Sequence, residues 1–115
     1  KELIPEIKVV AVEPEKSPVI SGGKAGAHKI QGIGAGFVPC NYKSEYIDEV
    51  IAVSDENAIA TTVEVADKES VLVGISSGAA IYAAIQVAQK LGKGKKVLAI
   101  APDGGEKYIS MGIFD

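Results

Sequence analysis

The stretch that decides the fold reads Val71-Leu72-Val73-Gly74-Ile75-Ser76-Ser77-Gly78-Ala79-Ala80. Three uncharged aliphatic residues lead into Gly-x-Ser-x-Gly, and an alanine-rich segment follows. This pattern predicts a strand over 71–73 that is buried on both faces, a tight turn, and a helix over 77–91 that ends at Gly92. A buried strand that passes through a glycine turn into a helix is typical of α/β proteins with a parallel sheet.

The segments on both sides repeat the alternation of strand and helix. We expect further strands over 8–12, 50–53 and 97–101, and further helices over 55–66 and from about residue 106. Ser54 is placed to cap the helix over 55–66. The glycine-rich segment 17–39 is expected to form a long functional loop with a short helix near its end. The sequence therefore predicts an α/β fold, a parallel sheet with helices on both faces and ligands at the carboxyl ends of the strands.

Composition excludes several classes of function. The 115 residues suffice for one small domain, and the net charge of -3 indicates neither a nucleic-acid partner nor an acidic membrane surface. Residues 71–89 carry no charge, but the glycine turn interrupts them, so a membrane span is not expected. The single cysteine, Cys40, excludes an internal disulfide and fits a reducing compartment.

Ser76 in the Gly-x-Ser-x-Gly stretch is the leading candidate functional residue. A hydrolase nucleophile on such a turn needs a later histidine, and His28, the only histidine, precedes it. Three interpretations stay open: an anion site at the start of the helix, a hydroxyl aimed at the ring nitrogen of a cofactor, and a helix cap by Ser76 or Ser77.

A second motif, Lys29-Ile30-Gln31-Gly32-Ile33-Gly34-Ala35-Gly36-Phe37, contains Gly-x-Gly without the third glycine of a dinucleotide site. Its glycines favour close approach of the backbone to a flat ligand. His28 has no cysteine or acidic cluster at metal-ligand spacing, so we expect a hydrogen-bonded structural histidine and no metal site. Cys40 is interpreted as an ordinary thiol.

Four motifs together resemble cysteine synthase, in the order in which that family carries them. They are residues 12–14 with 17–23, residues 28–39, residues 74–80 and residues 102–108. The resemblance implies the tryptophan synthase β-like, fold type II architecture of enzymes that use pyridoxal 5'-phosphate (PLP). It implies that O-acetyl-L-serine and sulfide are converted to L-cysteine and acetate by β-replacement. It also implies a cytoplasmic homodimer that can bind serine acetyltransferase.

The resemblance also assigns roles to single residues. Ser76 would be the hydrogen-bond partner of the pyridine nitrogen of PLP, and Gln31, Gly32 and Ile33 would lie along the cleft beside it. A neutral serine at the ring nitrogen makes a weaker electron sink than a carboxylate, which suits β-elimination better than transamination.

The amino-terminal motifs of the family, including its Schiff-base lysine and its phosphate loop, do not occur here. We therefore expect 1–115 to be a single partial domain, the carboxy-terminal part of the larger PLP-binding domain, with no catalytic residue of its own and no activity alone. The alternatives are an enzyme like cystathionine β-synthase or serine dehydratase, and a non-catalytic fragment that binds the tail of serine acetyltransferase.

Overall fold

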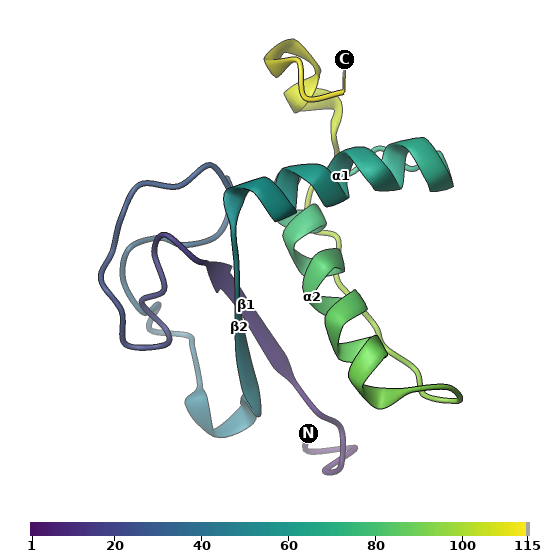
Figure 1. Ribbon diagram of the computed structural model, residues 1–115. Coiled ribbons are helices and arrows are strands. Elements are labelled where there is room, and N and C mark those ends of the chain that lie inside the picture. The colour runs from purple at the N-terminus through teal and green to yellow at the C-terminus, as the bar shows by residue number, and fades with distance from the viewer. Residues whose placement is uncertain (115) are drawn as a thin grey trace.

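A computed structural model describes residues 1–114, apart from the side chain of Lys107. Figure 1 shows two strands and two α-helices among these residues, together with one short 3-10 helix before β2 and another near the carboxyl end. In chain order, the elements are β1 (Val10–Pro14), η1 (Ser44–Tyr46), β2 (Glu49–Val53), α1 (Asp55–Glu69), α2 (Ile75–Leu91) and η2 (Glu106–Met111).

The two strands form the parallel pair that the α/β prediction requires. β1 and β2 run in register from Val10 opposite Glu49 to Pro14 opposite Val53. We expected the first strand to stop before Glu13, but it continues to Pro14. A proline has no N–H for the ladder and is tolerated in an edge strand, which β1 is among the described residues.

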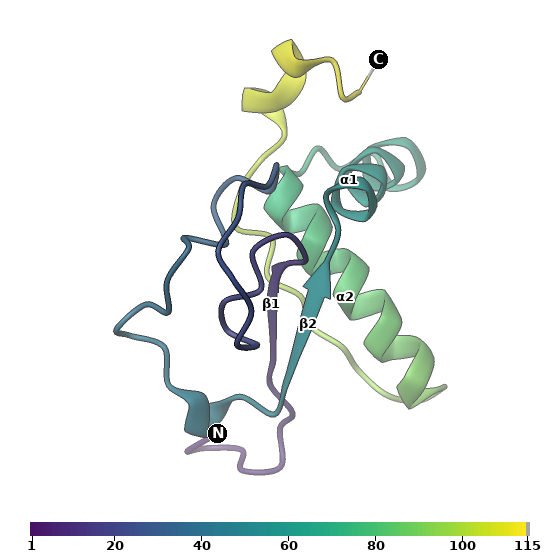
Figure 2. The same cartoon turned by 60° about the vertical axis from the view of Figure 1, so that its left-hand side comes forward.

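The two helices begin and end largely where the sequence predicts. Ser54 caps α1, because its hydroxyl oxygen accepts a hydrogen bond of 3.1 Å from the Asn57 N–H. α1 runs one turn beyond the predicted end, to Glu69. α2 begins at Ile75, two residues early, and ends at Gly92, whose φ is +80°. Both helices lie on one side of the strand pair, so the prediction of helices on both faces is wrong for residues 1–114 (Figure 2).

Two predicted strands are also wrong. Residues 71–73 make one isolated antiparallel bridge, between Val73 and Gly104, and Val71 is 51% exposed. Residues 97–101 belong to no strand, and Leu98 is 92% exposed. Both segments have the aliphatic composition of buried strands, but a strand exists only where a neighbouring backbone pairs along it, and residues 1–114 supply only the single bridge at Val73.

The segment 17–39 is a long loop, as predicted, but the short helix expected near its end does not form. Side chains from the regular elements hold this loop in place. The buried carboxylate of Glu13 accepts hydrogen bonds from the N–H groups of Ile20 and Ser21, at 2.8 and 3.1 Å. Asp55, the first residue of α1, accepts one from the Lys29 N–H at 3.0 Å. These contacts attach the loop to the regular elements, and Gly32 of the loop lies next to Ser76 at the start of α2.

The core joins this loop to the helices. Its buried members are Ile30, Val53, Ala58, Ile75, Ala79, Ala83 and Tyr108. Among the described residues, no helix has both the length and the apolar character that a bilayer span needs.

The two helices cross at Gly78. A β-carbon there would overlap the hydroxyl of Thr62 and would lie 2.5 Å from the carbonyl oxygen of Ala58. The buried Thr62 hydroxyl donates to that carbonyl at 2.8 Å, and the Gly74 carbonyl lies 3.3 Å away. The backbone of α1 and the buried, hydrogen-bonded side chain of Thr62 occupy this space. A residue larger than glycine at position 78 therefore fits only if α1 moves away from α2.

We expect Gly78→Ala to lower the free energy of unfolding by about 1–3 kcal/mol, because one methyl group forces α1 and α2 apart. The measurement is urea unfolding followed by circular dichroism. Ala88→Val is the matched control, since it enlarges an exposed residue of the same helix and should cost only about 0.5 kcal/mol. Equal losses in the two variants would show that the crossing is not tightly packed.

Candidate functional site: a serine hydroxyl at the start of α2

Ser76 lies in the first turn of α2 and is 4% exposed. Its hydroxyl donates a hydrogen bond of 2.9 Å to Oδ1 of Asp103, which is 27 residues further along the chain. The carboxylate and the start of the helix are therefore brought together by tertiary structure. Sequence reasoning did not find Asp103 as a site residue, and its only signal was its place in a turn of a resembling motif.

The carboxylate of Asp103 collects several donors. The Ser77 hydroxyl lies 2.6 Å from Oδ1, the Ser77 N–H donates to the same oxygen at 3.2 Å, and the Tyr108 hydroxyl donates to Oδ2 at 3.1 Å. Partial burial favours the protonated acid, but hydrogen bonds from Ser77, Ser76 and Tyr108 stabilise the carboxylate more, so the pKa of Asp103 lies below its usual value. Burial, and then the hydrogen bond to this carboxylate, raise the pKa of Tyr108.

This arrangement narrows the interpretations left open by the sequence. The N-cap position of α2 belongs to Gly74, which offers no side-chain cap, so neither Ser76 nor Ser77 is the capping residue. The first turn of a helix attracts anions, and here the carboxylate of Asp103 already occupies it through the Ser77 N–H. A separate phosphate or carboxylate at this turn would meet that negative charge. The arrangement therefore favours a hydroxyl that faces an uncharged or cationic group.

Gly32 presents bare backbone next to this hydroxyl. Its φ is +100°, and a β-carbon there would lie 3.7 Å from Ser76 Oγ. The structure thus brings Ser76 and Gly32 together. Ile33 is half-buried and packs against the core, whereas Gln31 is exposed. A flat ring could stand against the bare backbone at Gly32 with its edge toward Ser76, so these residues fit the ring-nitrogen side of PLP.

A hollow of about 490 Å³ lies against the same loop. It is bounded by β1 at Val12 and Glu13 and by the loop at Gly32, Ile33 and Phe37. Ser76 is not among its lining residues. Gly32 and Ile33 therefore border this hollow, whereas the buried Ser76 hydroxyl lies next to Gly32 and outside the lining of the hollow.

His28 is committed to the loop. Its Nε2 lies 2.9 Å from the Gly34 carbonyl oxygen, and its Nδ1 accepts from the Ile30 N–H at 3.1 Å. These contacts match the neutral tautomer with its proton on Nε2. Both ring nitrogens are used, so His28 is a hydrogen-bonded structural histidine, as predicted, and is no base for Ser76. Residues 1–114 contain no cluster of metal-ligating side chains.

Comparison with known proteins agrees with this geometry. The family described as "Pyridoxal-phosphate dependent enzyme" matches residues 1–103, and the chain belongs to that family. The cysteine synthase of Staphylococcus aureus (strain N315) is 51% identical over 114 residues, which are 99% of this chain and 37% of that protein. The chain therefore spans little more than a third of the length of the curated relatives it matches.

Solved structures give the same result. A crystal structure of cysteine synthase from Entamoeba histolytica superposes with a TM-score of 0.95 at 43% identity, over 99% of this chain and 34% of that one. An O-acetylserine dependent cystathionine beta-synthase from Helicobacter pylori gives 0.92 at 44% identity, over 100% of this chain and 37% of that one. These neighbours confirm the α/β, fold type II assignment.

The lowered pKa of Asp103 predicts a loss of stability in acid. A carboxyl group whose pKa is lower in the folded state stabilises the fold above its unfolded pKa of about 3.9, and this contribution is lost as the pH falls through the folded value. We expect the urea concentration at the unfolding midpoint to decrease when the pH is lowered below about 4. The decrease should be smaller in Asp103→Asn. Asp67→Asn, at an exposed position of α1, is the control. An unchanged pH dependence in Asp103→Asn would contradict the stabilising role of this carboxylate.

Proposed function

We propose that the chain is the carboxy-terminal part of a PLP-dependent cysteine synthase, which forms L-cysteine and acetate from O-acetyl-L-serine and sulfide by β-replacement. The observation that carries this proposal is the buried Ser76 hydroxyl beside the bare backbone of Gly32. The 51% identity to a cysteine synthase over nearly the whole chain supports the choice of reaction.

In the proposed enzyme, Ser76 holds the edge of the cofactor ring through a hydrogen bond to the pyridine nitrogen. Gly32 lets the ring approach the backbone, and Gln31 and Ile33 border the cleft on either side of that glycine. When bound, PLP supplies the electron sink for the bond changes at the substrate. The residues of this chain bind and orient the ring, and they carry none of the proton transfers.

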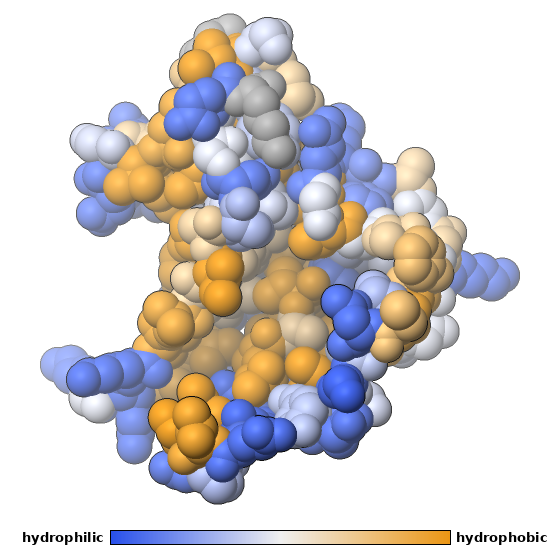
Figure 3. Space-filling view, turned by 180° about the vertical axis from the view of Figure 1, so that it is seen from behind, coloured by the Kyte–Doolittle hydropathy of each residue, from blue (hydrophilic) through white to orange (hydrophobic). Residues whose placement is uncertain are grey.

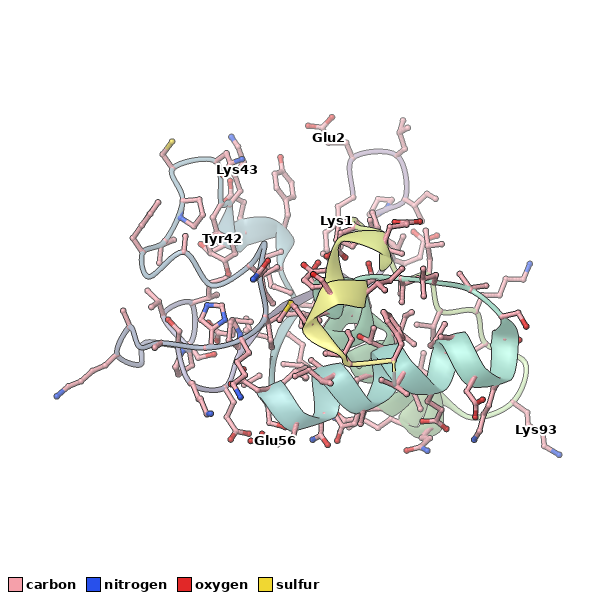
Figure 4. All side chains as sticks on the ribbon, turned by 90° about the horizontal axis from the view of Figure 1, so that it is seen from above. Lys1, Glu2, Tyr42, Lys43, Glu56 and Lys93 are labelled. Atoms are coloured by element: carbon pink, nitrogen blue, oxygen red, sulfur yellow. The ribbon has the colours of Figure 1, made fainter. Side chains whose placement is uncertain are left out.

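We place the lysine that binds PLP in a part of the protein outside residues 1–115. A reactive lysine amine needs a lowered pKa, which burial or a neighbouring cation provides. The two described lysines with a shifted pKa, Lys16 and Lys68, are shifted upward by hydrogen bonds to Asp55 and Glu64. Lys43 and Lys93 extend away from the molecule in Figure 4. This pattern supports an amine supplied from elsewhere.

An apolar groove supports the proposal that 1–115 is a partial domain. The groove has a volume of about 1180 Å³ and runs between residues 7–10 and residues 97–100, with Ala83 and Val87 of α2 among its lining residues. Figure 3 shows hydrophobic residues gathered around the hollow on this face. Its two walls are the edge strand β1 and the aliphatic segment that lacks a ladder. We propose that amino-terminal parts of the same protein fill the groove and pair with both.

Incubation of the 115-residue chain with PLP, followed by borohydride reduction and intact mass measurement, should give no stoichiometric adduct. The same treatment of a longer protein that contains this chain should give one adduct, on a lysine outside residues 1–115. Peptide mapping identifies the modified lysine. A single adduct on one lysine of the short chain would contradict the partial-domain proposal.

In the complete protein, Ser76→Ala should lower kcat/KM for cysteine formation roughly 10- to 100-fold, because one hydrogen bond to the ring is lost. Ser54→Ala, which removes the cap of α1 and lies away from the site, should cost about 1 kcal/mol of stability and leave kcat/KM unchanged. The assay is cysteine formation from O-acetylserine and sulfide. A loss shared equally by both variants would point to a folding defect.

The similarity to the Helicobacter pylori structure favours one second candidate, an enzyme like cystathionine β-synthase that uses homocysteine as its sulfur donor. If turnover of the complete protein were faster with homocysteine than with sulfide, this second candidate would replace cysteine synthase as the proposed function.

We further propose a cytoplasmic homodimer, and the free, exposed thiol of Cys40 is compatible with a reducing compartment. We also propose that the hollow bordered by Gly32 receives the carboxy-terminal tail of a serine acetyltransferase, which calorimetry with such a peptide would test.

A further inference from the structure

A serine hydroxyl has one proton, and in this structure Ser76 uses it to donate a hydrogen bond to the carboxylate of Asp103. The donor distance of 2.9 Å is that of an ordinary hydrogen bond. Carboxylates are stronger acceptors than neutral groups, so this bond sets the torsion of the Ser76 side chain. Because the side chain is 4% exposed, water competes little for the hydroxyl.

Asp103 is itself held firmly. Its carbonyl oxygen accepts from the Gly74 N–H at 3.0 Å, and its N–H donates to the Ser77 hydroxyl oxygen at 3.2 Å. The Tyr108 hydroxyl donates to its second carboxylate oxygen. Main chain and side chain are thus both fixed against α2, so the carboxylate cannot swing away from Ser76 without breaking several contacts.

We propose that Asp103 is a positioning residue for Ser76. Its carboxylate accepts the hydrogen bond of Ser76, which keeps the hydroxyl oxygen next to Gly32, and it places a negative charge one hydroxyl away from the ring nitrogen that Ser76 contacts. This inference rests on the proposed function and extends it. Negative charge close to a nitrogen base favours its protonated form. The pair therefore supplies part of the effect of a carboxylate placed directly at the ring nitrogen.

The test uses the complete protein, loaded with PLP that carries ¹⁵N at the ring position. Asp103→Asn keeps the size of the side chain and removes its charge. We expect it to weaken PLP binding roughly tenfold, as one charge-assisted hydrogen bond is lost, and to move the ring ¹⁵N signal toward that of the unprotonated ring. In a Ser76→Ala background the same substitution should change PLP affinity less than about twofold.

Ser77→Ala separates positioning from structural support. It removes the other hydroxyl bound to Asp103 and leaves the contact with Ser76 in place. It should lower stability and leave the ring ¹⁵N signal unchanged. The proposal would be overturned if Asp103→Asn weakened PLP binding equally in the wild-type and Ser76→Ala backgrounds. It would also be overturned if Ser77→Ala moved the ring ¹⁵N signal as far as Asp103→Asn does.

A second measurement does not require Asp103 to be replaced. With ¹³C in the aspartate carboxyl groups, addition of PLP should shift the Asp103 signal in the wild-type protein and not in Ser76→Ala. No shift in the wild type would overturn the inference. A wild-type protein that binds no PLP would instead refute the proposed function, so the two failures are distinguishable.

Discussion

The carboxylate of Asp103 holds the first turn of α2, and the position of Ser76 depends on that contact. The turn after the aliphatic segment 97–101 brings this carboxylate to the start of the helix, where the Ser77 N–H and two serine hydroxyls meet it. An anionic side chain at this end of a helix is favoured by the helix dipole. A stabilising contact and the orientation of the candidate functional hydroxyl therefore have the same physical origin.

Close approach of backbones is the second constraint. Gly78 lets α1 and α2 cross in contact, because a β-carbon there would overlap Thr62. Gly32, next to Ser76 Oγ, has a φ of +100°, a backbone conformation that favours glycine. The buried carboxylates of Glu13 and Asp55 then hold the loop on which Gly32 lies, through backbone N–H groups of that loop. Gly32 and Ser76 are therefore both attached, directly or through their neighbours, to regular elements.

The described residues leave much apolar surface uncovered. Leu98 and Ile100 are 92% and 73% exposed, and they flank the groove between residues 97–100 and β1. Exposed aliphatic residues next to an open strand edge are a recognised cause of association between chains. This uncovered surface is consistent with the finding that the chain spans 37% of the length of the Staphylococcus aureus protein.

The sequence by itself determined the parallel α/β class, both long helices, the cap at Ser54 and the family to which the chain belongs. These depend on local patterns, namely helical periodicity, capping residues and glycine turns, which short stretches of chain specify. Only the tertiary structure decided that residues 71–73 and 97–101 form no strands, since a strand needs a partner backbone and its composition alone cannot supply one. Only the tertiary structure also joined Asp103 to Ser76, because 27 residues separate them in the chain and no local pattern relates a turn residue to a distant start of a helix.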